Sequence, residues 1–289
     1  MFKNLLNFIK YNRLSLNLIH RFCLMNMANN FSLVNEVKRE SEVVISLSAE
    51  ENNFSDLEIT LYSLLNQIIK PDRVILWLDK NLELSELPYS ITSFVKRGLD
   101  IKFIDYKGDY TSIIYALKNF PDSIVVKASP NIFYPKDWLK KLYHSYISSP
   151  KDIHVHRAEI TEFKDSNYIS YNYWKKYAEQ PTAAFYHYPV SDCGILFPPR
   201  CFVSDFYRED IYNKKVNAKP DIWLMFMAIV SNRKIRLVKN HIKVFSYINW
   251  WKQLYSDYTN YKNYSNINEQ VLSLMDFYGQ NIRQKLKKN

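Results

Sequence analysis

The sequence predicts an α/β protein with a doubly wound, mostly parallel sheet flanked by helices. From residue 42 onward, short apolar runs alternate with longer amphipathic segments, and the loops between them are short. This alternation is typical of parallel strands joined by helical crossovers. Hydrophobic residues make up 47% of the 289 residues and charged residues 24%, as in an ordinary soluble globular protein.

The first half contains four apolar runs that we expect to form strands. They are residues 43–47, 74–78, 101–104 and 123–126. Between the first two, Ser55-x-x-Glu58 forms a capping box that predicts a helix start, and Pro71 is expected to end that helix. We expect further helices at 89–96, with Gly98 as C-cap, at 111–119, and from Pro135 onward.

The second half is less regular, and we expect three more strands and two helices there. The strands are 153–156, 194–197 and 235–238, one helix is opened by Pro220, and a last helix spans 268–278. We divide the chain into a basic amphipathic N-terminal extension, 1–41, a main domain, 42–248, and a helical C-terminal tail rich in Tyr and Asn, 249–289. In open parallel sheets ligands bind beyond the carboxyl ends of the strands, which are here 48–53, 79–81, 105–109 and 127–131.

Glycine is too scarce for the common phosphate-binding loops. The chain has 4 glycines, where average usage predicts about 20. No two of them have the spacing of G-x-G-x-x-G or G-x-x-x-x-G-K-[ST]. The dinucleotide fingerprint and the Walker A loop, which need glycine where the backbone approaches phosphate, are therefore excluded.

The chain is basic, with 39 Lys and Arg against 29 Asp and Glu and a net charge of +10. The positive charge is spread along the chain, and no RNA-binding aromatic motif or C2H2 pattern is present, so we do not expect a nucleic-acid partner. The three cysteines contain no C-x-x-C pair, which argues against a disulfide scaffold or a structural zinc site and suits a reducing cytosol.

Residues 1–35 contain no acidic residue, and their apolar positions follow helical spacing. Lys10, Arg13 and Arg21 interrupt the segment, so no apolar run is long enough to span a bilayer. Two interpretations stay open: a basic helix on an anionic membrane surface, or a helix packed on its own domain or a partner. We expect a cytoplasmic protein, with peripheral attachment to the inner face of the membrane under the first interpretation.

Several segments, taken in order, resemble bacterial GT-A glycosyltransferases related to family 2, which occur among enzymes of capsule, lipopolysaccharide and other surface-glycan assembly. The segments are VVISLSA (43–49), LNQIIKPDRVILWLD (65–79), FPDSIVVKASPNIFYPKDWLKKLYHSY (120–146), DIHVHRA (152–158), GILFPP (194–199) and KPDIWLMFMAI (219–229). The resemblance covers about residues 42–240 and implies a GT-A-like fold. It further implies a nucleotide-sugar donor and a glycan acceptor.

The family's metal motif is degenerate in this chain. Where the family has an aspartate run that holds a divalent cation against the donor diphosphate, this chain has Ser129, Pro130 and Asn131. Hard cations need carboxylate or carbonyl oxygens, so Mg²⁺ and Mn²⁺ are disfavoured here and we assign no metal ligand. The loop at 48–53 and the start of the third helix at 110–112 also lack the family's cationic residues.

The resemblance places six residues of this chain beside the donor. They are Ser48, Asp105, Asp109, Lys127, Ser129 and Asn131. Lys127 ends the fourth strand, where a small neutral residue is usual. A lysine can neutralise the charge that develops on a departing phosphate, so Lys127 is either a substitute for the missing cation or a surface lysine at a strand end.

Asp221 matches the second acid of the family's D-D-x-W stretch, and Pro220 occupies the place of the first. In inverting enzymes of this fold an acid near that helix start removes the proton of the acceptor hydroxyl. The alternative is an acid favoured at a helix N-terminus by the dipole.

Four residues are expected at the acceptor pocket: Asp192, Trp223, His156 and Arg157. Trp223 either stacks on a sugar or fills the core. His154 and His156 lie on one face of their strand, either as metal ligands or bonded to neighbours, and Arg157 lies on the opposite face. Overall the sequence predicts a glycosyltransferase without a standard metal site. The alternative is an inactive GT-A-like domain that binds glycan or pairs with an active transferase.

Overall fold

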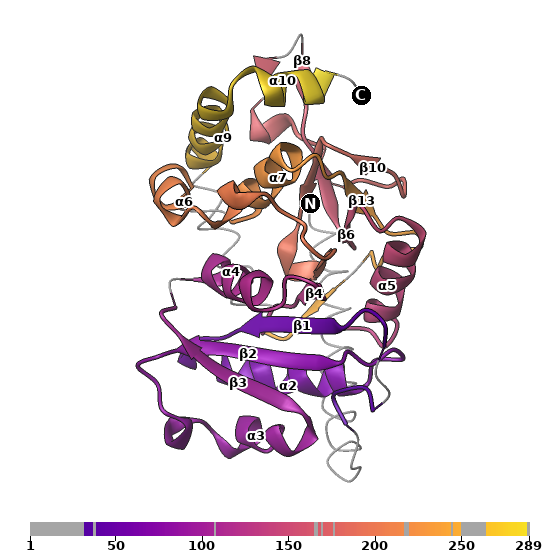
Figure 1. Ribbon diagram of the computed structural model, residues 1–289, viewed down its shortest axis with the longest axis vertical. Helices are drawn as coiled ribbons and strands as arrows, with labels where there is room; N and C mark the ends of the chain where they lie inside the picture. Colours follow the sequence, from indigo (N-terminus) through magenta and orange to yellow (C-terminus); the bar gives the residue numbers. More distant parts are fainter. Residues whose placement is uncertain are drawn as a thin grey trace, which may run out of the picture.

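A computed structural model describes residues 32–36, 39–106, 108–164, 167–168, 170–175, 177–216, 220–243, 245–249 and 264–287. Its centre is an eight-stranded sheet in the order β10-β13-β6-β12-β4-β1-β2-β3 (Figure 1). The strands are β1 (Val43–Ser48), β2 (Arg73–Asp79), β3 (Leu99–Ile104), β4 (Ile124–Lys127), β6 (Ile153–Val155), β10 (Ala183–Ala184), β12 (Ile195–Phe197) and β13 (Ile235–Leu237).

The sheet is mostly parallel, as the sequence predicts. Strands β3, β2, β1 and β4 run in one direction. Strand β12 is antiparallel to both β4 and β6, so β6 and its parallel neighbour β13 share the direction of β4, whereas β10 is antiparallel to β13. Among the described strands of this sheet, only β12 and β10 therefore run against the rest.

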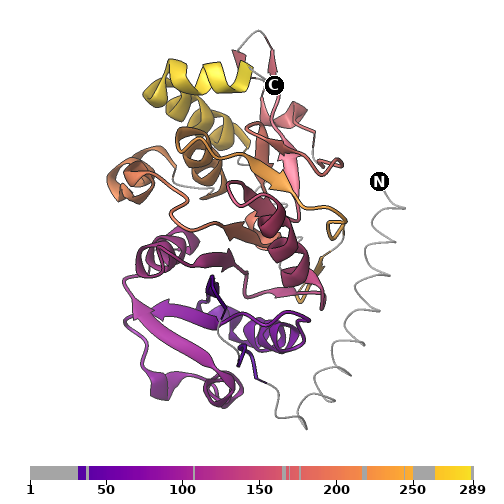
Figure 2. The ribbon, with the colours of Figure 1, turned by 45° about the vertical axis from the view of Figure 1, so that its right-hand side comes forward.

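Helices cover both faces of the sheet (Figures 1 and 2). One face carries α2 (Phe54–Leu65), α3 (Tyr89–Thr92) and α5 (Trp138–Ser148). The other carries α4 (Asp109–Asn119), α6 (Glu209–Lys215), α7 (Pro220–Val230), α9 (Tyr264–Tyr278) and α10 (Gln280–Lys287). Three two-stranded sheets pair β11 (His187–Pro189) with β7 (Ala158–Ile160), β14 (Ser246–Tyr247) with β5 (Ile132–Phe133), and β8 (Phe163–Lys164) with β9 (Asn167–Tyr168).

The two cores arise from the period-two alternation of the strands. In β1, Val43, Ile45 and Leu47 pack among α2, α3 and α5, whereas Val44 points into the cluster that contains α4 and α7. All six positions of β1 are buried, and four of them are apolar, as expected of a parallel strand between two helical layers.

Several expected boundaries are wrong. Helix α2 begins at Phe54, after a 3-10 turn at Glu51–Asn53, and has no side-chain cap, so Ser55 is not an N-cap. The turn satisfies the first amide instead, because Phe54 N–H donates to the Glu51 carbonyl. Helix α5 begins at Trp138 rather than at Pro135. The expected helix 89–96 is split into α3 and a 3-10 turn, which Gly98 ends in the left-handed region with φ of 99°, as predicted for a C-cap.

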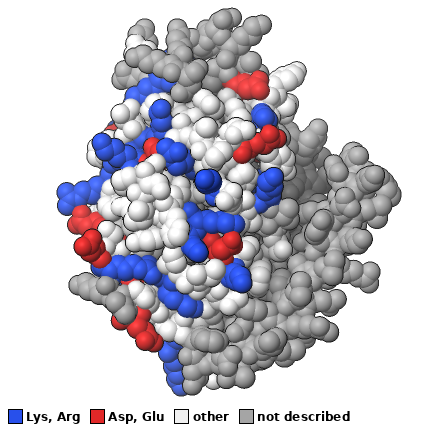
Figure 3. All heavy atoms as spheres, turned by 90° about the vertical axis from the view of Figure 1, so that its right-hand side faces the viewer, with Lys and Arg blue, Asp and Glu red and all other residues white. Residues whose placement is uncertain are grey.

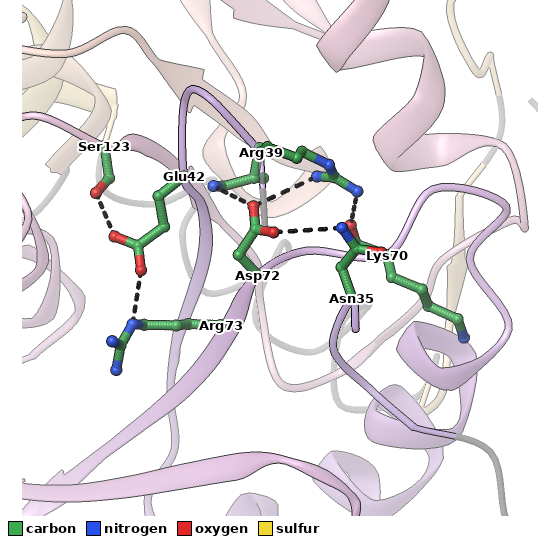
Figure 4. Close-up of polar contacts among 8 residues, drawn as sticks. Asn35, Arg39, Glu42, Lys70, Asp72, Arg73 and Ser123 are labelled. Carbon is green, nitrogen blue, oxygen red and sulfur yellow. Dashed lines mark hydrogen bonds and ion pairs between the residues drawn. The ribbon is translucent and has the colours of Figure 1, made fainter. Parts of the chain in front are cut away.

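Residues before β1 contact the amino ends of β1 and β2 through ion pairs and hydrogen bonds (Figure 4). Asp72 accepts a hydrogen bond from the Val43 amide at 2.8 Å and lies 3.6 Å from the Arg39 guanidinium. Glu42 accepts hydrogen bonds from Arg73 Nε at 2.7 Å and from Ser123 Oγ at 2.6 Å. This end of the sheet is thus closed by charge pairing, opposite the edge where we expect ligands.

Helices α9 and α10 pack against α7 at one end of the molecule (Figure 2). Val271, Leu274 and Ile282 are buried in the same cluster as α7. The sequence predicts a last helix over 268–278, but α9 begins earlier, at Tyr264, and a further helix, α10, follows it. The membrane-binding prediction for residues 1–35 lies almost entirely outside the described residues. Within the part that is described, no helix has the length and apolar character needed to cross a bilayer.

Candidate functional site

Polar side chains cluster where β4 ends and where the turn before β12 passes it. Lys127 is the last residue of β4 and is 4% exposed. Its Nζ donates to Ser129 Oγ and to Ser191 Oγ, both at 3.4 Å. Ser129 Oγ in turn donates to Asp192 Oδ1 at 3.0 Å. Lys127 is therefore not a surface lysine: its ammonium is buried and hydrogen-bonded in a network that ends on a carboxylate.

Asp221, in the first turn of α7, joins this network from the other side. Its Oδ2 accepts a hydrogen bond from the Ser191 amide at 3.4 Å. The residue is partly exposed, but its Oδ1 is buried and has no hydrogen-bond partner among the described residues. Burial raises the pKa of Asp221 to about 6, against the lowering effects of Ser191 and of the Lys127 charge, and the neighbouring Asp192 raises it further.

Arg157, two residues after the end of β6, lies near the buried Cys193 beside this cluster. Its guanidinium lies over the Tyr177 ring, 4.7 Å from the ring centre, and its charge acts on the buried Cys193 thiol. Burial raises the pKa of Cys193 to about 12, so the thiol stays neutral and is no nucleophile. Arg157 Nε is buried and, among the described residues, has no hydrogen-bond partner. The structure thus brings Lys127, Asp192 and Asp221 together, and Arg157 is connected to them only through Cys193, on which its charge and those of both aspartates act.

A pocket of about 510 Å³ lies at the carboxyl ends of β1 and β2. It is lined by Ala49, Glu50, Glu51, Asn52, Asp79, Asn81, Leu82 and Tyr106. Asp79 Oδ1 accepts hydrogen bonds from the Asn81 amide at 2.8 Å and from the Asn81 side chain at 2.6 Å. The lining is acidic, so it suits hydroxyl and amine groups better than phosphate.

Two expected acceptor residues are in the core instead. Trp223 is fully buried, and its Nε1 donates to the Phe206 carbonyl at 3.2 Å. His156 is fully buried against α5, where its Nε2 lies 3.0 Å from the Trp138 carbonyl and its Nδ1 accepts from the Ile242 amide at 3.3 Å. Burial lowers the pKa of His156 to about 3, so it is neutral and structural. Both assignments to the acceptor pocket are wrong, because apolar packing on each side of the sheet takes up these side chains.

The other expected donor residues are scattered. Ser48 ends β1 and is buried, whereas Asp105 pairs with Lys80 at 3.3 Å on the surface. Asp109 is the first residue of α4, and its side chain lies outside the described residues. Asn131 Oδ1 is buried and has no hydrogen-bond partner within the described part of the chain.

The residues present do not fit a divalent cation. The Lys127 ammonium is connected to the Asp192 carboxylate by hydrogen bonds through Ser129. Its positive charge also lowers the pKa of Asp221. A buried ammonium there repels a second cation. Within the residues described, no group of three or more His, Cys, Asp and Glu is arranged to hold a metal ion.

Two site residues were not predicted from the sequence. Ser191 holds Asp221 with its amide and accepts from Lys127 with its hydroxyl. Tyr134 is fully buried, accepts from the Ser129 amide at 2.7 Å and donates to the Asp192 carbonyl at 2.9 Å. The sequence feature that could have indicated Tyr134 is its position in the FYP stretch directly after the degenerate motif.

Comparison with known proteins gives similarity at the level of structure only. No protein-family model matches the chain, and no curated protein matches it. Among solved structures, a mannosyltransferase from Pyrobaculum calidifontis in complex with GDP-Man and Mn²⁺ is 13% identical over 51% of this chain, with a TM-score of 0.34, and the match spans 43% of that protein. A CMP:2-keto-3-deoxy-manno-octonic acid synthetase complexed with CTP matches with 9% identity over 68% of this chain and 88% of its own, at a TM-score of 0.41. The inositol-1-phosphate CTP transferase from T. maritima matches with 10% identity over 81% of this chain and 98% of its own, at a TM-score of 0.41. Similarities this low carry no conclusion about activity.

Proposed function

We propose that this chain is a transferase that moves a sugar from a nucleotide-activated donor to a hydroxyl of a glycan acceptor, without a divalent cation. The observation that carries the proposal is that Asp221, a carboxylate with a raised pKa, lies within the electrostatic influence of the buried Lys127 ammonium, with Ser191 bonded to both. A general base and a fixed cation in one cluster are the two groups that such a transfer needs.

Asp221 is suited to act as the base. A pKa of about 6 leaves it ionised at neutral pH, while keeping it a stronger base than an exposed aspartate. The Asp221 carboxylate takes the proton of the acceptor hydroxyl as the hydroxyl oxygen bonds to the anomeric carbon. The Ser191 amide donates to Oδ2 and so fixes the orientation of the carboxylate.

Lys127 is suited to stabilise the leaving group. As the bond between the anomeric carbon and the phosphate oxygen breaks, negative charge grows on the departing nucleotide phosphate, and the ammonium offsets it. The acidic pocket at the ends of β1 and β2 takes the base and ribose, because Asp79 and Glu50 can accept hydrogen bonds from ribose hydroxyls.

The test is a thermal-shift screen of nucleotide sugars in EDTA and in Mn²⁺, followed by a nucleotide-release assay with any donor that binds. We expect stabilisation in EDTA, loss of release in Asp221→Asn with binding retained, and weaker binding in Lys127→Met. Stabilisation that requires Mn²⁺ would contradict the metal-free proposal.

A second function, sugar binding without transfer, is favoured by the acidic lining of the pocket. Carboxylates and amides bind sugar hydroxyls well, and the lining residues include no lysine or arginine to hold a diphosphate. This function predicts binding of free oligosaccharides and no nucleotide release.

The proposal extends to the cellular setting. The basic segment 1–35 is proposed to hold the chain at the cytoplasmic face of an anionic membrane, where surface-glycan acceptors such as capsule or lipopolysaccharide precursors are assembled. A fusion of residues 1–35 to a soluble reporter that fails to sediment with anionic liposomes would overturn this part.

A further inference from the structure

Several basic side chains that no proposed step uses lie along and beside α5. Figure 3 shows the face of the molecule that carries α5, with Lys and Arg side chains gathered on it. A groove of about 510 Å³ lies there, between α5 and the segment that leaves β13. Its basic lining residues are Lys140, Lys141, Arg236 and Lys239, with His144 beside them.

The walls of the groove come from two rigid elements. Lys140, Lys141 and His144 recur at helical spacing on one face of α5. Arg236 lies in β13, and Lys239 follows that strand. No residue of this lining belongs to the Lys127–Asp221 cluster or to the pocket at β1 and β2, so the groove is a separate site.

Local acids neutralise only part of the charge. Lys141 pairs with Asp137 at 2.8 Å, and Arg236 pairs with Asp152 at 2.8 Å. Lys140 and Lys239 form no ion pair with any residue that the structure describes. Two lysines that face one groove repel each other, and a bound anion with more than one charge relieves that repulsion.

We propose that this groove binds a ligand with several phosphate groups. Its volume is in the range of small-ligand pockets, about 300–1,000 Å³, and lysines bind phosphate as point charges. The lining has no Phe, Tyr or Trp, so it has no platform for stacking the bases of a nucleic acid. The phosphate belongs either to a soluble molecule or to an anionic lipid headgroup.

The test compares two double variants of the full-length protein with the same change in charge. Lys140→Glu with Lys239→Glu alters the groove, and Lys96→Glu with Lys214→Glu alters exposed lysines elsewhere. Tripolyphosphate binding is measured by calorimetry in EDTA, and sedimentation with phosphatidylglycerol vesicles in parallel. Unchanged unfolding temperatures establish that both variants are folded.

We expect the groove variant to weaken the binding of at least one probe by about tenfold or more, and the control variant to change it by less than about twofold. Loss with tripolyphosphate assigns the phosphate to a soluble ligand, and loss with vesicles alone assigns it to a lipid headgroup. Equal behaviour of the two variants with both probes, or no binding of either probe by the wild type, would overturn the proposal. Donor binding at the Lys127–Asp221 cluster is expected to survive in the groove variant, so the two proposals fail independently.

Discussion

Replacing Asp221 by Asn should stabilise the protein at neutral and alkaline pH. The folded state raises the pKa of Asp221 from its ordinary value of 3.8 to about 6. The folded protein therefore holds the proton more tightly than the unfolded chain does, and stability falls as the pH rises through this interval. Asn has no charge to bury and still offers a carbonyl oxygen to the Ser191 amide.

The size of the effect follows from the shift of about 2.2 pH units, which corresponds to about 3 kcal/mol at 1.36 kcal/mol per unit. Because the residue is partly exposed, we expect about 1–3 kcal/mol, or an increase of several degrees in Tm for a chain of this size.

The assay is urea unfolding of the wild type and the variant at pH 4, 6 and 8, with Asp276→Asn, an exposed position on α9, as the control. The difference should be largest at pH 8 and near zero at pH 4. A variant that is less stable at pH 8, or a difference that does not change with pH, would refute the electrostatic reasoning.

Four other changes test the rest of the structure. Gly194→Ala should destabilise the protein by at least about 2 kcal/mol in urea unfolding, because the added Cβ would lie 2.5 Å from Trp138 Cζ2 and φ is +100°; an unchanged midpoint would contradict this packing. Trp223→Ala should cost about 3–5 kcal/mol and Trp223→Phe less, since Trp223 is fully buried; a loss of sugar binding without a loss of stability would place it in the pocket after all. His156 should stay neutral in NMR titrations down to about pH 4, because burial lowers its pKa to about 3. The stability that the neutral imidazole contributes to the folded state is complete above pH 6.5 and is lost as the pH falls toward 3. A titration midpoint near 6.5 would contradict this prediction. Lys127→Met should lower stability more at pH 8 than at pH 5, because Asp221, whose pKa is about 6, loses its neighbouring cation where it is ionised, and Lys127→Arg should restore part of the stability; equal losses at both pH values would separate Lys127 from Asp221.

The strand pattern was predictable because buried parallel strands are apolar on both faces. β1, β2 and β4 fall within a residue or two of the expected runs, and the left-handed Gly98 ends its turn as expected. Helix starts were less predictable. The Ser55-x-x-Glu58 pattern is present, yet the 3-10 turn before it already satisfies the first amide, which sequence spacing does not reveal.

The candidate site was predictable in part for a similar reason. Alternation along the expected strand, 153–156, predicts that Arg157 lies opposite His156, but it does not show which face is core and which is site; in the structure β6 ends at Val155, before both residues. His156 faces the packed side of α5, where the Trp138 carbonyl and the Ile242 amide bond its two ring nitrogens. Ser191 carries no motif of its own, since its role depends on the turn that brings it between Lys127 and Asp221.

The most direct test of the metal-free transferase is nucleotide release from a donor sugar in EDTA, measured from pH 5 to pH 8. For the wild type we expect a rate that rises with pH around a midpoint near 6, set by the ionisation of Asp221. Asp221→Asn should abolish release while donor binding persists. Full activity of Asp221→Asn, or release only when Mn²⁺ is added, would contradict the account.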